Sequence, residues 1–112
     1  MSETKLSRVT KIGLTILKSH PEILEITCIG EAGTPKWEKV HLSQYVYVRP
    51  PDGGIYEFDL VGTPPEGTVK QIVTEYTADK FTWKNFPKDL KVVKITAVDN
   101  SMSKDLTSTV RI

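Results

Sequence analysis

β-branched side chains are the feature that most limits how this chain can fold. Valine, isoleucine and threonine fill 33 of the 112 positions, whereas alanine, the strongest helix former, occurs only three times. Branching at Cβ crowds the turns of a helix but fits the pleated surface of a sheet. Because the length is that of one domain, we expect a single all-β domain over residues 1–112, with residues 1–8 as a disordered N-terminal tail.

Turn signals divide the chain into short segments. Proline and glycine cluster at 50–54 and 62–67, where they mark the two clearest turns. Between such breaks, alternating apolar and polar residues predict half-buried strands. The expected strands are 10–17, 24–30, 44–49, 55–61, 68–76, 81–83, 91–98 and 106–112, with a polar turn at 100–104.

Two of these segments need comment. Residues 10–17 also fit a short helix, but Gly13 and the threonines favour the strand. Residues 44–49 and 55–61 are expected to form a hairpin with a long loop. Because tyrosines and valines alternate in residues 44–49, we expect that strand to be covered on both faces.

The number and spacing of the strands indicate the architecture. Seven or eight short strands separated by regular turns are typical of an antiparallel two-sheet sandwich, and a small β-barrel is the alternative. We expect an immunoglobulin-like sandwich. Each strand then needs apolar residues on one face only, so 38% hydrophobic residues suffice for a core. Trp37, Phe58 and Trp83 are its expected large members.

Charge, cysteine content and the N-terminal residues limit the partners and the cellular compartment that we expect for the chain. A net charge of +1 disfavours the broad basic surface that binds nucleic acid without sequence preference. The single cysteine, Cys28, excludes an intramolecular disulfide. Residues 1–5 have no apolar stretch behind them, and no run of about 20 apolar residues could span a membrane. We expect a soluble, cytoplasmic protein without nucleic-acid or membrane partners.

Residues with metal-binding or nucleophilic chemistry are few. His20, Cys28 and His41 lack the spacing of metal ligands, and residues 99–105 resemble a calcium loop without its central glycine and closing glutamate. We therefore expect neither a metal nor a cofactor. Cys28 alternates with Leu24 and Ile26, which predicts a buried, unreactive thiol.

An enzyme is the least supported class. The serines lack a nucleophile-elbow motif, and Cys28 with His41 is the one thiol–imidazole pair that can be proposed. Glu57 and Asp59 lie on the polar face of their strand, where we expect solvated carboxylates that pair with lysines of neighbouring strands. The least implausible catalytic group would be His41 with Glu57 or Asp59. We expect no catalytic residues.

Aromatic residues are the most suggestive group. Candidate binding residues are Trp37, Tyr45, Tyr47, Tyr56 and Trp83. Tyr45 and Tyr47 share one face of their segment and are the pair most suited to a surface stripe, while Trp37 follows a turn and is expected to cover an open end of the sandwich. Exposed rings of this kind anchor protein interfaces or stack on sugars.

These features together predict a non-enzymatic binding module. We expect a protein partner, or self-association through a sheet edge, with recognition by the tyrosine segment and the loops 31–36, 50–54 and 62–67. Carbohydrate or small-ligand binding through exposed aromatic residues is the alternative. Residues 80–94 combine lysines with aromatic rings, as single-stranded nucleic acid requires, but nearby acids and the overall charge balance weigh against that reading.

Overall fold

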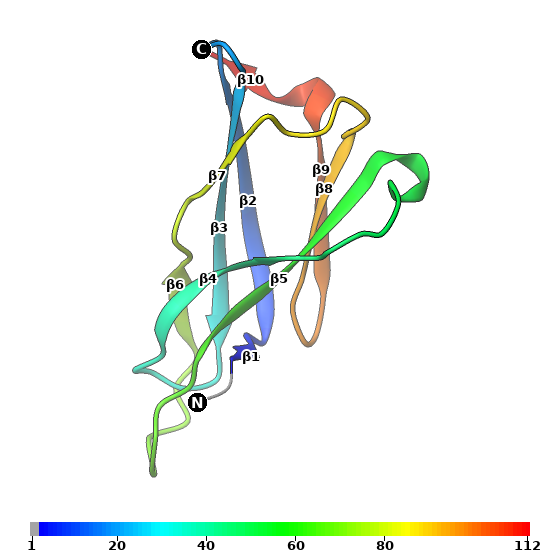
Figure 1. Ribbon diagram of the computed structural model, residues 1–112. Helices are drawn as coiled ribbons and strands as arrows, with labels where there is room; N and C mark the ends of the chain where they lie inside the picture. The colour runs from blue at the N-terminus through cyan, green and yellow to red at the C-terminus, as the bar shows by residue number, and fades with distance from the viewer. Residues whose placement is uncertain (1–2) are drawn as a thin grey trace.

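The computed structural model describes residues 3–112. Two sheets pack face to face in it, and buried and exposed residues alternate along their main strands. Ten strands and two short 3-10 turns follow one another along the described chain. They are β1 (Thr4–Lys5), β2 (Arg8–Leu17), β3 (Ile23–Ala32), β4 (Glu38–Gln44), η1 (Asp52–Gly54), β5 (Ile55–Thr63), β6 (Thr74–Thr77), β7 (Phe81–Lys84), β8 (Val92–Thr96), β9 (Ser101–Asp105), η2 (Leu106–Ser108) and β10 (Val110–Arg111). Figure 1 shows β2 and β3 as the long strands of one sheet.

Each sheet is organised around one central strand. In the β5 sheet, β4 pairs with one edge of β5, whereas β8 pairs with the other edge and leads on to β9; β1 adds a short pairing near Val61. In the β3 sheet, β2 and β10 lie on one side of β3, and β6 and β7 follow one another along its other edge. The predicted all-β two-sheet sandwich is confirmed. The immunoglobulin-like detail stays a prediction.

The strand count and directions differ from the expectation. The described residues form ten strands where we expected seven or eight, because several segments pair over only two to four residues. The pattern is not wholly antiparallel either. β5 pairs with β8 in parallel, and β10 pairs with β2 in parallel.

The core lies between the inner faces of the two sheets. Phe58 is fully buried, and its ring makes edge contacts with Phe81 and Trp83 at centroid distances of 5.1 and 5.8 Å. The inward position predicted for Cys28 is confirmed, since its side chain is almost completely buried. Trp37 and Trp83 are only partly buried and pack against the margin of this core.

The N-terminal third forms strands, as predicted for residues 10–17. β2 pairs with β3 along almost its whole length, because the inner positions Ile12, Leu14 and Ile16 alternate with outer ones once a bulge near Thr10 has corrected the register. The expected disordered tail is wrong for residues 4–8. β1 lies within it, and Leu6 is completely buried. Residues 1 and 2 lie outside the described part of the chain.

The hairpin around residues 50–54 is confirmed, but its first strand was placed too late. β4 covers Glu38–Gln44, with Val40 and Leu42 facing inward, and pairs with β5. Regular pairing of β4 with β5 ends at Gln44–Phe58, and continuing that register would place residues 48 and 49 opposite η1. Two glycines there have positive φ, at 71° for Gly53 and 69° for Gly54.

Residues 68–76 were expected to be one strand, but only the last part of that range pairs. β6 pairs with the end of β3, and this pairing stops at Ala32–Thr74 because β3 itself ends at Ala32. Residues 68–73 therefore have no neighbouring strand. Ile72 and Val73 are exposed as a result.

The last third contains two further corrections. The expected polar turn at 100–104 is largely the edge strand β9, which pairs with β8 and places Met102 against the core. The expected strand 106–112 is reduced to β10, because Leu106 begins the turn η2 and packs against the core. The strand 91–98 is confirmed as β8, with Val93 and Ile95 buried.

Hydrogen bonds also join the two sheets at their margins. Asn100 binds both backbone groups of Val9: the Val9 N–H donates to Asn100 Oδ1 and Asn100 Nδ2 donates to the Val9 carbonyl, each at 2.8 Å. Farther along β2, Lys104 Nζ of β9 donates to the Ile12 carbonyl at 3.4 Å. Beyond β6, the Asp79 N–H donates to the carbonyl of Val40 on β4.

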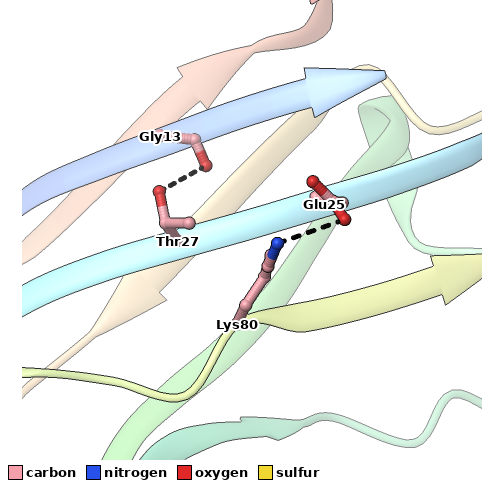
Figure 2. A network of polar contacts seen from close by, with 4 residues as sticks. All are labelled: Gly13, Glu25, Thr27 and Lys80. Carbon is pink, nitrogen blue, oxygen red and sulfur yellow. Dashed lines mark hydrogen bonds and ion pairs between the residues drawn. The ribbon is translucent and has the colours of Figure 1, made fainter. Parts of the chain in front are cut away.

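The outer face of the β3 sheet carries polar contacts. Figure 2 shows the Thr27 hydroxyl donating to the Gly13 carbonyl at 3.4 Å, and Lys80 Nζ paired with Glu25 at 3.4 Å. A side chain at position 13 would collide with the Thr27 hydroxyl, which accounts for glycine inside this strand. These polar groups are therefore paired with each other on the outer face of the sheet.

Candidate functional site

Residues 45–49 form one wall of an aromatic groove. The Tyr45 N–H still donates to the Glu57 carbonyl (3.1 Å), and the Glu57 N–H donates to the Tyr47 hydroxyl (2.9 Å), so both tyrosines are held toward β5. The neighbouring Val46 and Val48 are 95% and 103% exposed. The prediction that this segment is covered on both faces is therefore wrong.

Four aromatic rings form a continuous row along the groove. Tyr45 stacks on Tyr47 at a centroid distance of 6.5 Å, Tyr47 meets the edge of Tyr56 at 5.4 Å, and Tyr56 meets Trp83 at 5.8 Å. The groove has a volume of about 430 Å³. Its lining includes these four rings with Gln44, Val46, Val48, Arg49, Pro50 and Pro87.

Neighbouring carboxylates bind the hydroxyls of two tyrosines. Tyr45 donates to Asp59 Oδ1 and Tyr56 donates to Asp89 Oδ1, each at 2.9 Å. The hydrogen bond to Asp59 raises the pKa of Tyr45 to about 12. Burial, together with the bond to Asp89, raises the pKa of Tyr56. Each hydroxyl therefore donates its single proton to a carboxylate of the protein at neutral pH.

The two sides of the groove are tied together. The Lys91 N–H donates to the Gly54 carbonyl at 2.9 Å, and a side chain at position 54 would collide with the Asp89 carbonyl, so only glycine permits this close approach. Pro50 and Pro87, whose φ angles are fixed by their rings, both line the groove. The groove therefore exists in the protein without a ligand, because backbone contacts hold its two sides together.

Four of the five predicted binding residues meet in this groove. Tyr45, Tyr47, Tyr56 and Trp83 line it, whereas Trp37 does not. Trp37 donates through its indole N–H to the Thr34 hydroxyl at 2.9 Å and packs against the core. The other lining residues were not singled out, although all but Pro87 fall within the predicted tyrosine segment or the loop 50–54: Gln44, Val46, Val48, Arg49 and Pro50. The signal for Val46 and Val48 was their position before the Pro50-Pro51 pair, because proline ends strand pairing and leaves preceding apolar residues uncovered.

The three predicted recognition loops do not form one surface. In Figure 1 the segments around 31–36 and 62–67 lie at the lower end of the molecule, while 50–54 lies at the upper right. Parts of these ranges are also strand, because β3 extends to Ala32 and β5 extends to Thr63. Only the loop 50–54 adjoins the groove, through Pro50.

The groups considered for catalysis lie apart. Burial raises the pKa of the Cys28 thiol to about 12, which keeps it protonated. His41 contacts Glu3 (Nε2 to Oε2, 2.8 Å) and the Lys39 carbonyl, and none of its recorded contacts is to Cys28, Glu57 or Asp59. Asp59 instead lies 3.8 Å from Lys5 Nζ and accepts from Tyr45. The predicted pairing of this outer-face carboxylate with a lysine is confirmed for Asp59.

Other functional signals are weak in the described part of the chain. No three His, Cys, Asp or Glu residues among 3–112 converge as metal ligands, and no helix there has the length and hydropathy needed to cross a membrane. In the basic segment 80–94, Phe81 and Trp83 contact Phe58 in the core, while Lys80 pairs with Glu25. The lysine and the rings therefore lie on different faces of β7.

A second hollow of about 450 Å³ lies near the C-terminal end of the sandwich. It is lined by charged and apolar residues, among them Glu22, Lys88, Arg111 and Phe86. Glu22 and Arg111 form an ion pair with each other at 2.8 Å. Because Glu22 and Arg111 are already paired with each other, the aromatic groove is the better candidate for a binding site.

Comparison of the chain with protein-family models, with curated proteins and with solved structures finds no match. The functional argument therefore depends on the groove.

Proposed function

We propose that this chain is a non-enzymatic, cytoplasmic protein-interaction module whose binding surface is the aromatic groove. The observation that carries the proposal is the pair of fully exposed valines, Val46 and Val48, beside a row of four aromatic rings. Protein interfaces are enriched in aromatic anchors, and contiguous exposed apolar groups mark contact surfaces.

The backbone of the same segment supports a peptide-like ligand. Residues 46–49 form no backbone hydrogen bonds with other residues of the described chain, so their N–H and C=O groups are free to bind. The alternative, a carbohydrate, is less well supported. Sugar hydroxyls require several convergent polar partners, and the groove offers fewer donors because Tyr45 and Tyr56 already donate their hydroxyl protons to Asp59 and Asp89.

Selection from a random peptide library tests the proposal. We expect peptides enriched on the wild-type chain to lose binding to Val46→Asp, because a carboxylate replaces an exposed apolar contact without disturbing the fold. Val98→Asp is the matched control, since Val98 is 65% exposed and does not line the groove. The proposal fails if no peptide is enriched, or if enriched peptides bind Val46→Asp as well as they bind Val98→Asp.

Self-association is a second candidate, favoured by exposed Ile72 and Val73 next to β6, an outer strand of the β3 sheet. A strand-favouring segment without a partner can pair with the same segment of a second copy. Sedimentation equilibrium tests this idea: we expect a dimer that Val73→Lys dissociates. A monomer over the accessible concentration range would exclude it.

A further inference from the structure

We propose that the natural ligand of the groove is an extended, proline-rich peptide that carries a carboxylate next to its prolines. This inference rests on the proposed function and names the chemistry of the partner. It depends on three features of the groove: its apolar ring surface, its unpaired donors and its single charged side chain.

The ring surface suits proline side chains. Tyr45 is 36% exposed and, with its hydroxyl proton donated to Asp59, offers a ligand mainly its ring. Tyr56 is 7% exposed and contributes by contacting the rings of Tyr47 and Trp83 that complete the row. Pyrrolidine rings pack on such surfaces, and a polyproline II backbone enters a groove without needing a neighbouring strand. The walls are already in place, because Gly54 and Lys91 join the two sides, so little ordering cost falls on the protein.

The polar groups left in the groove are predominantly donors. The Trp83 indole N–H has no hydrogen-bond partner among the described residues, in contrast to the Trp37 indole, which binds Thr34. The Tyr47 hydroxyl accepts from Glu57, and its own proton has no acceptor in the described chain. A proline-rich backbone offers carbonyl acceptors and lacks N–H donors at each proline. Donors in the groove and acceptors in the ligand are therefore complementary.

Charge fixes the remaining feature of the ligand. Arg49 is the one charged residue among those that line the groove, and it forms no ion pair within the described chain. Its guanidinium presents two parallel donors that match a carboxylate. We therefore assign an acidic side chain to the ligand, placed beside the prolines that contact the rings.

Nuclear magnetic resonance of the intact chain gives a direct test, because its two indole N–H signals report different places. The probe is a blocked peptide of prolines with one central glutamate. We expect it to shift the Trp83 indole signal and leave the Trp37 signal unchanged. A peptide with alanines in place of the prolines should bind at least tenfold more weakly, and cellobiose should cause no shift.

A charge exchange tests the carboxylate. Replacing the glutamate of the peptide by lysine should weaken binding to the wild type by about fivefold, the upper range for an exposed ion pair, and Arg49→Glu should reverse this preference. The inference is overturned if the proline peptide leaves Trp83 unshifted at millimolar concentration, if the alanine peptide or cellobiose shifts it equally, or if the charge exchange has no effect. The proposed function survives those results when the library selection still yields groove-dependent peptides of other chemistry.

Discussion

Replacing Asn100 by alanine should cost more than a half-exposed asparagine on a turn usually does. The side chain satisfies both backbone groups of Val9, with two hydrogen bonds of 2.8 Å, and Val9 is almost completely buried. Each bond contributes about 0.5–1.5 kcal/mol net, and an unsatisfied buried partner costs about 1–3 kcal/mol. The net contribution of the two bonds is thus about 1–3 kcal/mol, and because Asn100→Ala leaves both groups of the buried Val9 without a protein partner, we expect the upper part of that range, about 2–3 kcal/mol.

Urea unfolding followed by fluorescence measures this loss. For a domain of this size the expected change corresponds to a fall in Tm of about 10 °C. Ser103→Ala on the following strand β9 is the control, because Ser103 is exposed, and surface substitutions of this kind stay within about 0.5 kcal/mol. Asn100→Asp adds a second check: at neutral pH its carboxylate accepts from Val9 but cannot donate back, and acidification restores a donor. A loss under about 0.5 kcal/mol for Asn100→Ala would refute the reasoning.

Three further outcomes follow from the core and the groove. Phe58→Ala should lower the free energy of unfolding by about 3–5 kcal/mol, because it empties the fully buried position against which Phe81 packs; a loss below 1 kcal/mol in urea unfolding would contradict this. Cys28 should not react with a thiol reagent in native buffer and should react fully in denaturant, since its pKa is raised to about 12 by burial; rapid native labelling would argue against the buried position. Stability should fall as pH rises from about 10 to about 12, because the pKa values of Tyr45 and Tyr56 are higher in the folded than in the unfolded chain. This contribution to stability is complete below the unfolded pKa of tyrosine and is lost as pH rises through the folded pKa. Tyr56→Phe should flatten the decline in thermal melts, and an unchanged slope would contradict the reasoning.

Local alternation was enough to predict much of the fold. The strands around Leu14, Ile26 and Phe58 were found because each buries every second residue. Prediction failed where the outcome depended on which strand lies next to a segment, because that information is not local in the sequence. Residues 45–49 and 68–73 have strong strand propensity but are not strands, whereas β9 has weak propensity and pairs because β8 lies next to it.

The candidate site was predictable in its rings but not in its shape. Tyr45, Tyr47, Tyr56 and Trp83 were singled out by residue type, yet the groove exists because Trp83 and Pro87 come from chain segments far from the tyrosines. The bonds from Lys91 to Gly54 and from Tyr56 to Asp89 bring these segments together. Such contacts span more than 30 residues and leave no local pattern.

The outer side of β2 has a consequence for the behaviour of the protein in concentrated solution. Along this side the Asn100 amide is hydrogen-bonded to the backbone of Val9, and the Lys104 ammonium is hydrogen-bonded to the Ile12 carbonyl. β10 pairs with Thr15 and Ile16. A foreign strand that sought to extend the β3 sheet into a fibril would have to displace all three groups. One of the longest strands is thereby shielded from templating amyloid-like growth, although no single element runs along its full length.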